Sequence, residues 1–397
     1  MLTSLLDDTY PEETRRHVLS VTIARLNANA CFRFAPPFLA SISDDLSTSL
    51  SRIGVALMIT ELLMIVSPII GGYVDRMHRR TSMVAGLLGV SAAAALAAIS
   101  PGLVVFVVAI TALGMSKLVF DVGLTAWVND HVDYERRGRV IGITETSWAL
   151  GLLIGVTVMG LVASASSWRW GYVTGAAATA LMAVVIARRL GPDGEYHPSR
   201  RLESTRRPLP REGYWVVLAM FFLMAASQCM FVTFGSWLDD DFGFTEAGIA
   251  AVAFGLGAFE LFASITSSRR TDVWGKERSA ALGAALIVPS GILLAVVGSN
   301  VAIGLVLLAL FLLGFEFAIV SLLPLAANVI PESPGRGLGW AIGGGTLGRA
   351  TMSVVATALY DSHGIAAASL VGAGCALVCV GVTWWYGRTV DLTRQPR

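Results

Sequence analysis

Long apolar segments separated by short polar loops dominate the chain. A helix that crosses a bilayer needs about 20 consecutive apolar residues, and the sequence holds twelve stretches of this kind. They lie at about 17–40, 51–71, 82–100, 104–129, 139–162, 170–189, 213–237, 246–267, 279–298, 301–325, 337–359 and 364–386. These stretches lack the strict alternation that marks the strands of a membrane barrel. The pattern predicts an all-α membrane protein with twelve transmembrane helices.

The loops on the two sides of these helices differ in their basic residues. Cytoplasmic loops of membrane proteins are enriched in Lys and Arg. One set of loops holds Arg15, Arg16, Arg76, Arg79, Arg80, Arg136, Arg137, Arg139, Arg269, Arg270, Lys276, Arg278, Arg336, Arg388, Arg394 and Arg397. The opposite loops hold only Arg52 and Arg169, and the loop at 238–245 is acidic (DDDFGFTE). We expect a multi-pass protein of the cytoplasmic membrane with both termini in the cytoplasm.

A polar, basic and proline-rich stretch divides the apolar segments into two groups of six. Residues 190–212 read LGPDGEYHPSRRLESTRRPLPRE, which is typical of a linker. Shifting the first half by 197 positions places Asp75 on Asp272 and Gly151 on Gly348. A parallel repeat of six-helix halves is a transporter architecture, with the substrate site near the bilayer midplane. We predict an N-terminal half at 1–189, a cytoplasmic linker at 190–212 and a C-terminal half at 213–397.

Composition narrows the class of protein further. The chain is 55% hydrophobic and 14% charged, whereas a soluble domain carries roughly 25% charged residues. Its net charge of +1 argues against a nucleic-acid partner. The sequence contains no P-loop, dinucleotide fingerprint, catalytic triad or metal-ligand cluster. We therefore expect neither an enzyme nor a cofactor or metal site. We also expect a monomer whose partners are a small-molecule substrate, protons and the lipid bilayer.

Residues 71–81, GGYVDRMHRRT, carry a resemblance to a known family. They are similar to the signature that the major facilitator superfamily has between helices 2 and 3. A degenerate second copy, TDVWGKERS, follows the eighth segment. The fifth segment has the glycine spacing of an antiporter (Gly151, Gly155, Gly160), with Val156 at the place of the usual Gly-Pro. The resemblance implies two pseudo-symmetric six-helix halves and secondary transport by alternating access, most like the proton-coupled drug-efflux branch.

The resemblance also implies a cytoplasmic gate. The signature residues are Gly71, Asp75, Arg76, Arg79 and Arg80. In the family this loop packs against helix 11 and holds the cytoplasmic side shut. Arginines that only set orientation are the alternative. Glu145, in the cytoplasmic third of the fifth helix, is interpreted as a gating or structural acid.

Several ionisable residues lie inside the predicted helices, where a charge costs about 2.5–3.5 kcal/mol on insertion scales. They are Arg25, Arg33, Glu61, Lys117, Asp121, Glu145, Glu260, Glu316 and Arg349. Helices 3, 6, 9 and 12 have none in their interiors. In the superfamily those four helices are outer supports, and helices 1, 4, 7 and 10 line the cavity. We expect the charges to face the cavity and to pair.

The acids among these residues are candidates for proton coupling: Asp121, Glu61, Glu316 and Glu260. Lys117 and Asp121 are spaced i, i+4 and can pair, but Asp121 can instead pair with Arg25 or Arg33. A static pair and a carboxylate that exchanges a proton during transport are equally open interpretations. Glu61 has no cation within one turn and is either a proton carrier or a neutral, hydrogen-bonded acid. Arg349 is a plausible partner of Glu260 or Glu316.

Polar, basic and aromatic residues in the same helices are candidates for the substrate cavity: Arg33, Asn29, Lys117, Trp148, Gln228 and Arg349. The sequence predicts a secondary active transporter that exports a small organic molecule in exchange for protons. The alternatives are a proton-coupled uptake symporter and a lipid flippase on the same fold. Two cations, Arg33 and Lys117, suit a small anionic metabolite as the cargo of a symporter.

Overall fold

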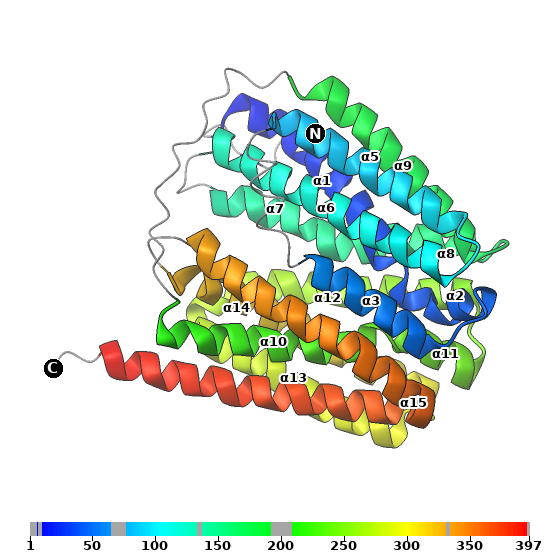
Figure 1. Cartoon of the computed structure of the whole chain (residues 1–397). Coiled ribbons are helices and arrows are strands. Elements are labelled where there is room, and N and C mark those ends of the chain that lie inside the picture. The colour runs from blue at the N-terminus through cyan, green and yellow to red at the C-terminus, as the bar shows by residue number, and fades with distance from the viewer. Residues whose placement is uncertain are drawn as a thin grey trace. The chain divides into compact units, whose positions relative to one another are not determined.

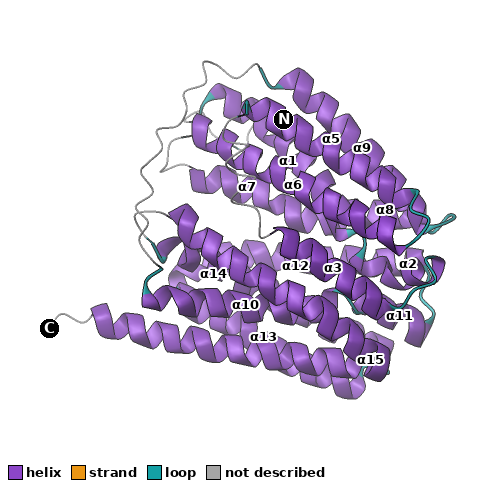
Figure 2. Ribbon diagram, in the orientation of Figure 1, coloured by secondary structure: helices purple, strands orange, loops and turns teal. Residues whose placement is uncertain are grey.

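The computed structural model describes residues 6, 10–64, 77–132, 137–191, 209–330 and 334–394. Within these ranges the chain forms helices and connecting loops and has no strand (Figure 2). Among the described residues, nine helical segments are long and apolar enough to cross a membrane, and the last of them, Gly337–Arg388, spans two of the predicted helices. The prediction of an all-α membrane protein is confirmed.

The chain divides into two compact units. Unit 1 consists of residues 1–35, 63–204 and 246–257, and unit 2 consists of residues 36–62, 205–245 and 258–397. Each unit therefore includes a short segment from the other half of the sequence. The boundaries predicted for the two halves and the linker stay a prediction, since most of the linker lies outside the described residues.

Unit 1 is built around its first helix. Its elements are α1 (Glu12–Arg33), α5 (Arg79–Ala98), α6 (Leu103–His131), α7 (Arg137–Leu150), η3 (Gly151–Val156), α8 (Thr157–Ala163), α9 (Trp168–Arg189) and the start of α12 (Glu246–Trp274). Helix α1 packs against α6, α7, η3 and α9, and α5 packs against α6 and α9 (Figure 1). The buried side chains Val18, Val21, Ala24 and Ala28 recur at helical spacing on α1, so that one face of this helix enters the core.

The fifth predicted helix is interrupted by a π-helical segment, η3. A Cβ added at Gly155 would lie 2.3 Å from the Ala30 Cβ, and one at Gly257 would lie 2.5 Å from the Leu153 nitrogen. The backbone of η3 is therefore in close contact with α1 and with the first part of α12. Thr157 Oγ1 donates a hydrogen bond to the Leu152 carbonyl, five residues back, at 3.2 Å. The wider π turn is thus supported by side-chain bonding as well as by packing.

Unit 2 holds the remaining helices. They are η1 (Pro36–Phe38), α2 (Leu39–Asp45), α3 (Leu50–Met64), α10 (Arg211–Phe231), α11 (Phe234–Phe242), the rest of α12, α13 (Lys276–Val297), α14 (Val301–Asn328) and α15 (Pro334–Arg394). Helix α15 combines the last two predicted helices, which meet at Gly364 with φ 65° and ψ −162°. Glycine adopts this positive φ without the clash that a Cβ would cause. The predicted boundary between the two helices falls at this break.

Helices α10 and α15 approach each other closely because glycines line their contact. A Cβ at Gly344 would lie 2.6 Å from Val217 Cγ1, and one at Gly348 would lie 2.1 Å from the Phe221 carbonyl oxygen. The second clash is with backbone, which cannot move aside as a side chain can. The spacing between these two helices therefore depends on Gly348.

Gly348→Ala should lower the stability of the protein. The added methyl group has no room beside Phe221, and overpacking of this kind typically costs ~1–3 kcal/mol. Gly343→Ala is the matched control, since it lies in the same helix with nothing within 4 Å of the new Cβ. Thermal unfolding in detergent should show a lower midpoint for Gly348→Ala and an unchanged or higher one for Gly343→Ala. Equal midpoints would contradict the close approach of α10 and α15.

Candidate functional site

The carboxylate of Asp121 lies at the centre of a charged cluster in unit 1. Lys117, one turn earlier on α6, places its Nζ 2.5 Å from Asp121 Oδ2. Arg25, on α1, places its Nε 3.1 Å from Asp121 Oδ1. The predicted pairing of Lys117 with Asp121 is confirmed, and Arg25 is its second partner. Each carboxylate oxygen therefore faces a cation from a different helix.

Arg25 extends this cluster to α7. Its Nη1 lies 2.7 Å from Glu145 Oε1 and donates a hydrogen bond of 3.2 Å to the Thr144 carbonyl. Lys117, Asp121, Arg25 and Glu145 thus alternate in charge, and we call them the Asp121 network. Side-chain exposure is 7% for Lys117, 23% for Asp121 and 14% for Arg25, and it reaches 50% for Glu145. The Lys117–Asp121 end is the more deeply buried, so removal of one partner there leaves a charge that water does not fully solvate.

Aromatic rings flank the cations of this region. The Arg33 guanidinium lies 4.7 Å from the centroid of the Trp148 ring, and Arg33 Nη1 donates a hydrogen bond of 2.9 Å to the Trp148 carbonyl. Lys117 Nζ lies 5.7 Å from the Trp148 ring and 5.6 Å from the Phe32 ring. These are cation–π distances. Three of the predicted cavity residues, Arg33, Lys117 and Trp148, are therefore brought together.

Asn29 is held inside the contact between α1 and α7. Its side chain is fully buried, and its Nδ2 donates a hydrogen bond of 3.2 Å to Ser147 Oγ. Ser147 Oγ donates to the Thr144 carbonyl, so Asn29 must be the donor in the bond between these two side chains. Its Oδ1 has no hydrogen-bond partner among the described residues. Asn29 thus positions α7 on α1 in this conformation.

Unit 2 contains a second ion pair, between Glu61 of α3 and Arg349 of α15. Glu61 has no cation within one turn of its own helix, and its partner Arg349 approaches from a helix 288 positions further along the chain. The same two helices also meet at Ser51, whose backbone nitrogen donates a hydrogen bond of 3.0 Å to Asp361 Oδ2. Between these points, a Cβ at Gly54 would lie 2.4 Å from the Ser353 carbonyl oxygen. Helix α3 is therefore joined to α15 along the described part of its length.

The other predicted residues of the second half lie in the interior of unit 2. Gln228 of α10 donates a hydrogen bond of 2.8 Å from Nε2 to Ser353 Oγ, which lies one turn from Arg349. Glu260 and Glu316 are buried on α12 and α14. Their proposed roles in proton coupling stay predictions.

A hydroxyl cluster between α12 and α14 was not predicted from the sequence. Ser321 Oγ lies 3.0 Å from Ser267 Oγ and 2.9 Å from Thr271 Oγ1, and it donates a hydrogen bond to the Phe317 carbonyl at 2.9 Å. The spacing i, i+4 of Ser267 and Thr271 within an apolar helix is the signal that could have found it. The cluster ties the two helices together with hydrogen bonds that lipid cannot replace.

Part of the predicted gate can be located in the structure. Gly71, Asp75 and Arg76 lie outside the described residues. Arg79 Nε lies 2.8 Å from Asp130 Oδ2, at the end of α6, and Arg80 donates a hydrogen bond to the Ala187 carbonyl of α9. Glu145 belongs to the Asp121 network. In this conformation Arg79, Arg80 and Glu145 thus bind partners within unit 1.

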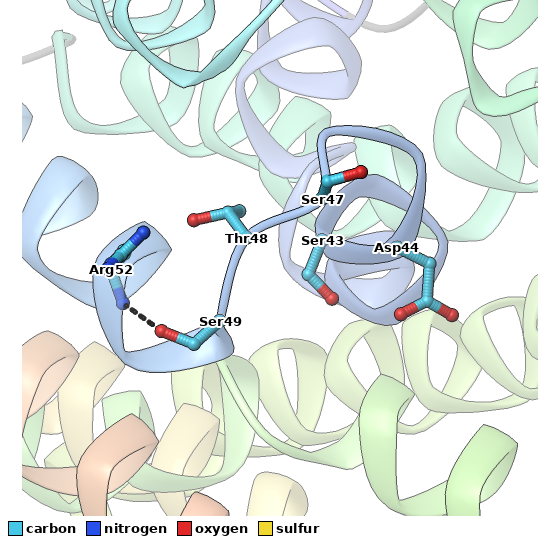
Figure 3. A pocket seen from close by; sticks show the side chains of 6 residues that line it. All are labelled: Ser43, Asp44, Ser47, Thr48, Ser49 and Arg52. Atoms are coloured by element: carbon cyan, nitrogen blue, oxygen red, sulfur yellow. Dashed lines mark hydrogen bonds between the residues drawn. The ribbon is translucent and has the colours of Figure 1, made fainter.

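A hollow of about 460 Å³ lies at the turn between α2 and α3. Figure 3 shows its lining of short polar side chains with one acid and one arginine: Ser43, Asp44, Ser47, Thr48, Ser49 and Arg52. The Arg52 backbone nitrogen donates a hydrogen bond of 3.4 Å to Ser49 Oγ, at the beginning of α3. None of the predicted cavity residues lines this hollow, which belongs to the turn.

Comparison with known proteins identifies the family of the chain. The model of the Major Facilitator Superfamily matches residues 19–326 and 216–397. An uncharacterised MFS-type transporter of Bacillus subtilis, YwfA, is 24% identical over 87% of this chain and 84% of its own length. Multidrug resistance protein 1 of the same organism is 27% identical over 70% of this chain and 73% of its own length.

Solved structures show the same fold. A bacterial homologue of the human lysosomal transporter Spinster, in an inward-facing and unoccupied conformation, has a TM-score of 0.78 at 10% identity, over 95% of this chain and 98% of its own. The human organic anion transporter MFSD10 (TETRAN) has a TM-score of 0.65 at 19% identity, over 94% of this chain and all of its own. The match of the family model over most of the chain shows that this protein belongs to the Major Facilitator Superfamily of membrane transporters.

Proposed function

We propose that the protein is a secondary transporter that exports a small organic molecule in exchange for protons, by alternating access. The observation that carries the proposal is the sharing of Asp121 between Lys117 and Arg25, in the apolar segment Leu103–Val128. The similarity to a multidrug resistance protein supports export as the direction. We further propose that the protein is a monomer in the cytoplasmic membrane with both termini in the cytoplasm, as the loop charges predict.

Asp121 suits proton coupling because one proton changes the charge balance of the whole network. While Asp121 is ionised, it holds Lys117 and Arg25 together. When it takes up a proton, both cations lose a counter-charge, although Arg25 keeps Glu145. The contact between α6 and α1 then weakens while the contact between α1 and α7 remains. Proton binding can thereby favour one conformation over another, as coupling requires.

The test is proton movement in proteoliposomes that contain a trapped pH-sensitive dye. With the lumen made acidic, addition of a transported compound should release protons from the lumen if the two move in opposite directions. A panel of small cationic, neutral and anionic aromatic dyes supplies the compounds. A cysteine at Gly191 reports the orientation by labelling, because Cys31, Cys229, Cys375 and Cys379 are buried. Transport of a dye by the wild type with no proton movement would refute the coupling.

A proton-coupled uptake symporter for a small anionic metabolite is the second candidate. It is favoured by Arg33 and Lys117, which lie at the same Trp148 ring, and by the similarity in fold to an organic anion transporter. A symporter moves protons in the same direction as its substrate. In the proteoliposome assay, only anionic compounds should then cause proton movement. These compounds should accumulate on the side to which protons flow.

A further inference from the structure

An exposed patch of aromatic residues and one arginine covers one end of unit 2. It consists of Tyr214 and Trp215 at the beginning of α10 and of Trp384, Trp385 and Arg388 near the end of α15. The rings of Trp215 and Trp385 lie 6.4 Å apart, which joins the two helices. The Arg388 guanidinium lies 3.6 Å from the centroid of the Trp384 ring. We call these five residues the aromatic–basic patch.

The patch lies where apolar helices begin and end. The membrane-compatible segments Arg211–Phe242 and Gly337–Arg388 have their first and last residues here, respectively. Helix α13, which begins at Lys276, starts at the same end, because a Cβ at Gly387 would lie 3.7 Å from Glu277 Cβ. Trp and Tyr at such positions reside at the level of the lipid headgroups. The patch therefore faces the interface of the bilayer.

The charges around the patch favour an anion. Arg211, Lys276, Arg278 and Arg388 lie at this end, against the acids Glu212 and Glu277. Arg388 has no carboxylate within ion-pair distance among the side chains that the structure describes, and its contact is the Trp384 ring. A guanidinium stacked on a ring keeps its N–H donors available at the edge, where they can bind phosphate oxygens. Exposed Leu377 and Val378 continue along α15 and offer an apolar surface to an acyl chain.

We propose that the aromatic–basic patch binds the headgroup of an anionic phospholipid, with Arg388 as the phosphate ligand and Trp384 and Trp385 packed on the glycerol region. A zwitterionic lipid presents the same phosphate beside a cationic group, which the surrounding arginines disfavour. Each basic residue near an anionic lipid surface contributes about 1 kcal/mol. Loss of one such residue corresponds to about a fivefold change in affinity.

The experiment uses the full-length protein in nanodiscs made of phosphatidylcholine and phosphatidylglycerol with the same acyl chains. Native mass spectrometry gives the ratio of the two lipids that stay bound after detergent extraction. The wild type should be enriched in phosphatidylglycerol, and Arg388→Gln should lower this enrichment about fivefold. Trp384→Leu should also lower it, because the ring that orients Arg388 is lost. Raised ionic strength should reduce the enrichment of the wild type more than that of Arg388→Gln.

The matched control is Trp170→Leu in α9. Trp170 and Trp384 are both 53% exposed, but Arg169, beside Trp170, donates hydrogen bonds of 3.1 Å and 2.7 Å to the carbonyls of Ala98 and Ser100. Trp170→Leu should keep the enrichment of the wild type. The proposal fails if Arg388→Gln keeps full enrichment, or if Trp170→Leu loses as much as Trp384→Leu. All variants change exposed residues, and unaltered thermal unfolding midpoints would show that they fold.

Discussion

Asp121→Asn should abolish proton-driven transport while the substrate still binds. Asparagine keeps the size of the side chain and one acceptor oxygen for Lys117 or Arg25, but it cannot exchange a proton. Flux driven by a pH gradient should fall to that of empty liposomes, whereas exchange of labelled for unlabelled substrate across the membrane should continue. Both fluxes are measured in proteoliposomes with a compound that the wild type transports.

Asp121→Asn alone leaves Lys117 and Arg25 without the anion that they share. Removal of one partner from a buried ion pair lowers the stability of a protein by ~3–5 kcal/mol. The double variant Asp121→Asn/Lys117→Met removes one of the two cations as well and keeps Arg25 paired with Glu145. It should therefore recover stability without recovering coupling. Normal proton-driven flux in either variant would show that Lys117 and Asp121 are a structural pair only.

Arg349→Met should destabilise the protein strongly, by ~3–5 kcal/mol, because it leaves the carboxylate of Glu61 buried without its cation. Only 8% of the Glu61 side chain is exposed, so water cannot take the place of the guanidinium. Thermal unfolding of the purified protein measures this effect as a lower midpoint.

The compensating variant Glu61→Gln/Arg349→Met removes both charges. Replacement of a buried pair by neutral groups of similar volume is often neutral or stabilising, so its midpoint should return close to that of the wild type. A double-mutant cycle then gives the interaction energy of the two side chains. If the two single changes simply add, Glu61 and Arg349 do not stabilise each other and the contact of α3 with α15 depends on Gly54 and Ser51.

The sequence predicts local features of the site well and distant ones poorly. Lys117 and Asp121 meet because a helix brings residues four apart to the same face, and this requires no knowledge of the fold. The apolar runs likewise predict the helices, since a bilayer admits few other structures. The break at Gly364 falls at the first residue of the last predicted helix, 364–386.

Pairs between distant segments could not be predicted in this way. Glu61 has no cation nearby in the chain, and its partner Arg349 was expected to join Glu260 or Glu316. Arg25 and Arg33 were equally good partners for Asp121 by sequence, because both lie on α1. The structure separates them by their positions along α1: Arg25 contacts Asp121, and Arg33, two turns later, contacts Trp148. The choice depends on how α1 packs against α6 and α7, which no pattern in the sequence specifies.

The π-helical segment η3 has a consequence for the directions in which the side chains of this helix point. A π turn accommodates one more residue than an α turn, and each α-helical residue advances the direction by about 100°. A helical wheel drawn continuously from Arg137 to Ala163 therefore misplaces the side chains beyond Gly151 by roughly this angle. Glu145 and Trp148 keep their orientation toward α1, whereas Met159 and its neighbours are rotated from the positions that a uniform helix would give them. Loss of a single residue between 151 and 156 would convert the bulge into regular helix and leave every later side chain pointing in nearly its present direction.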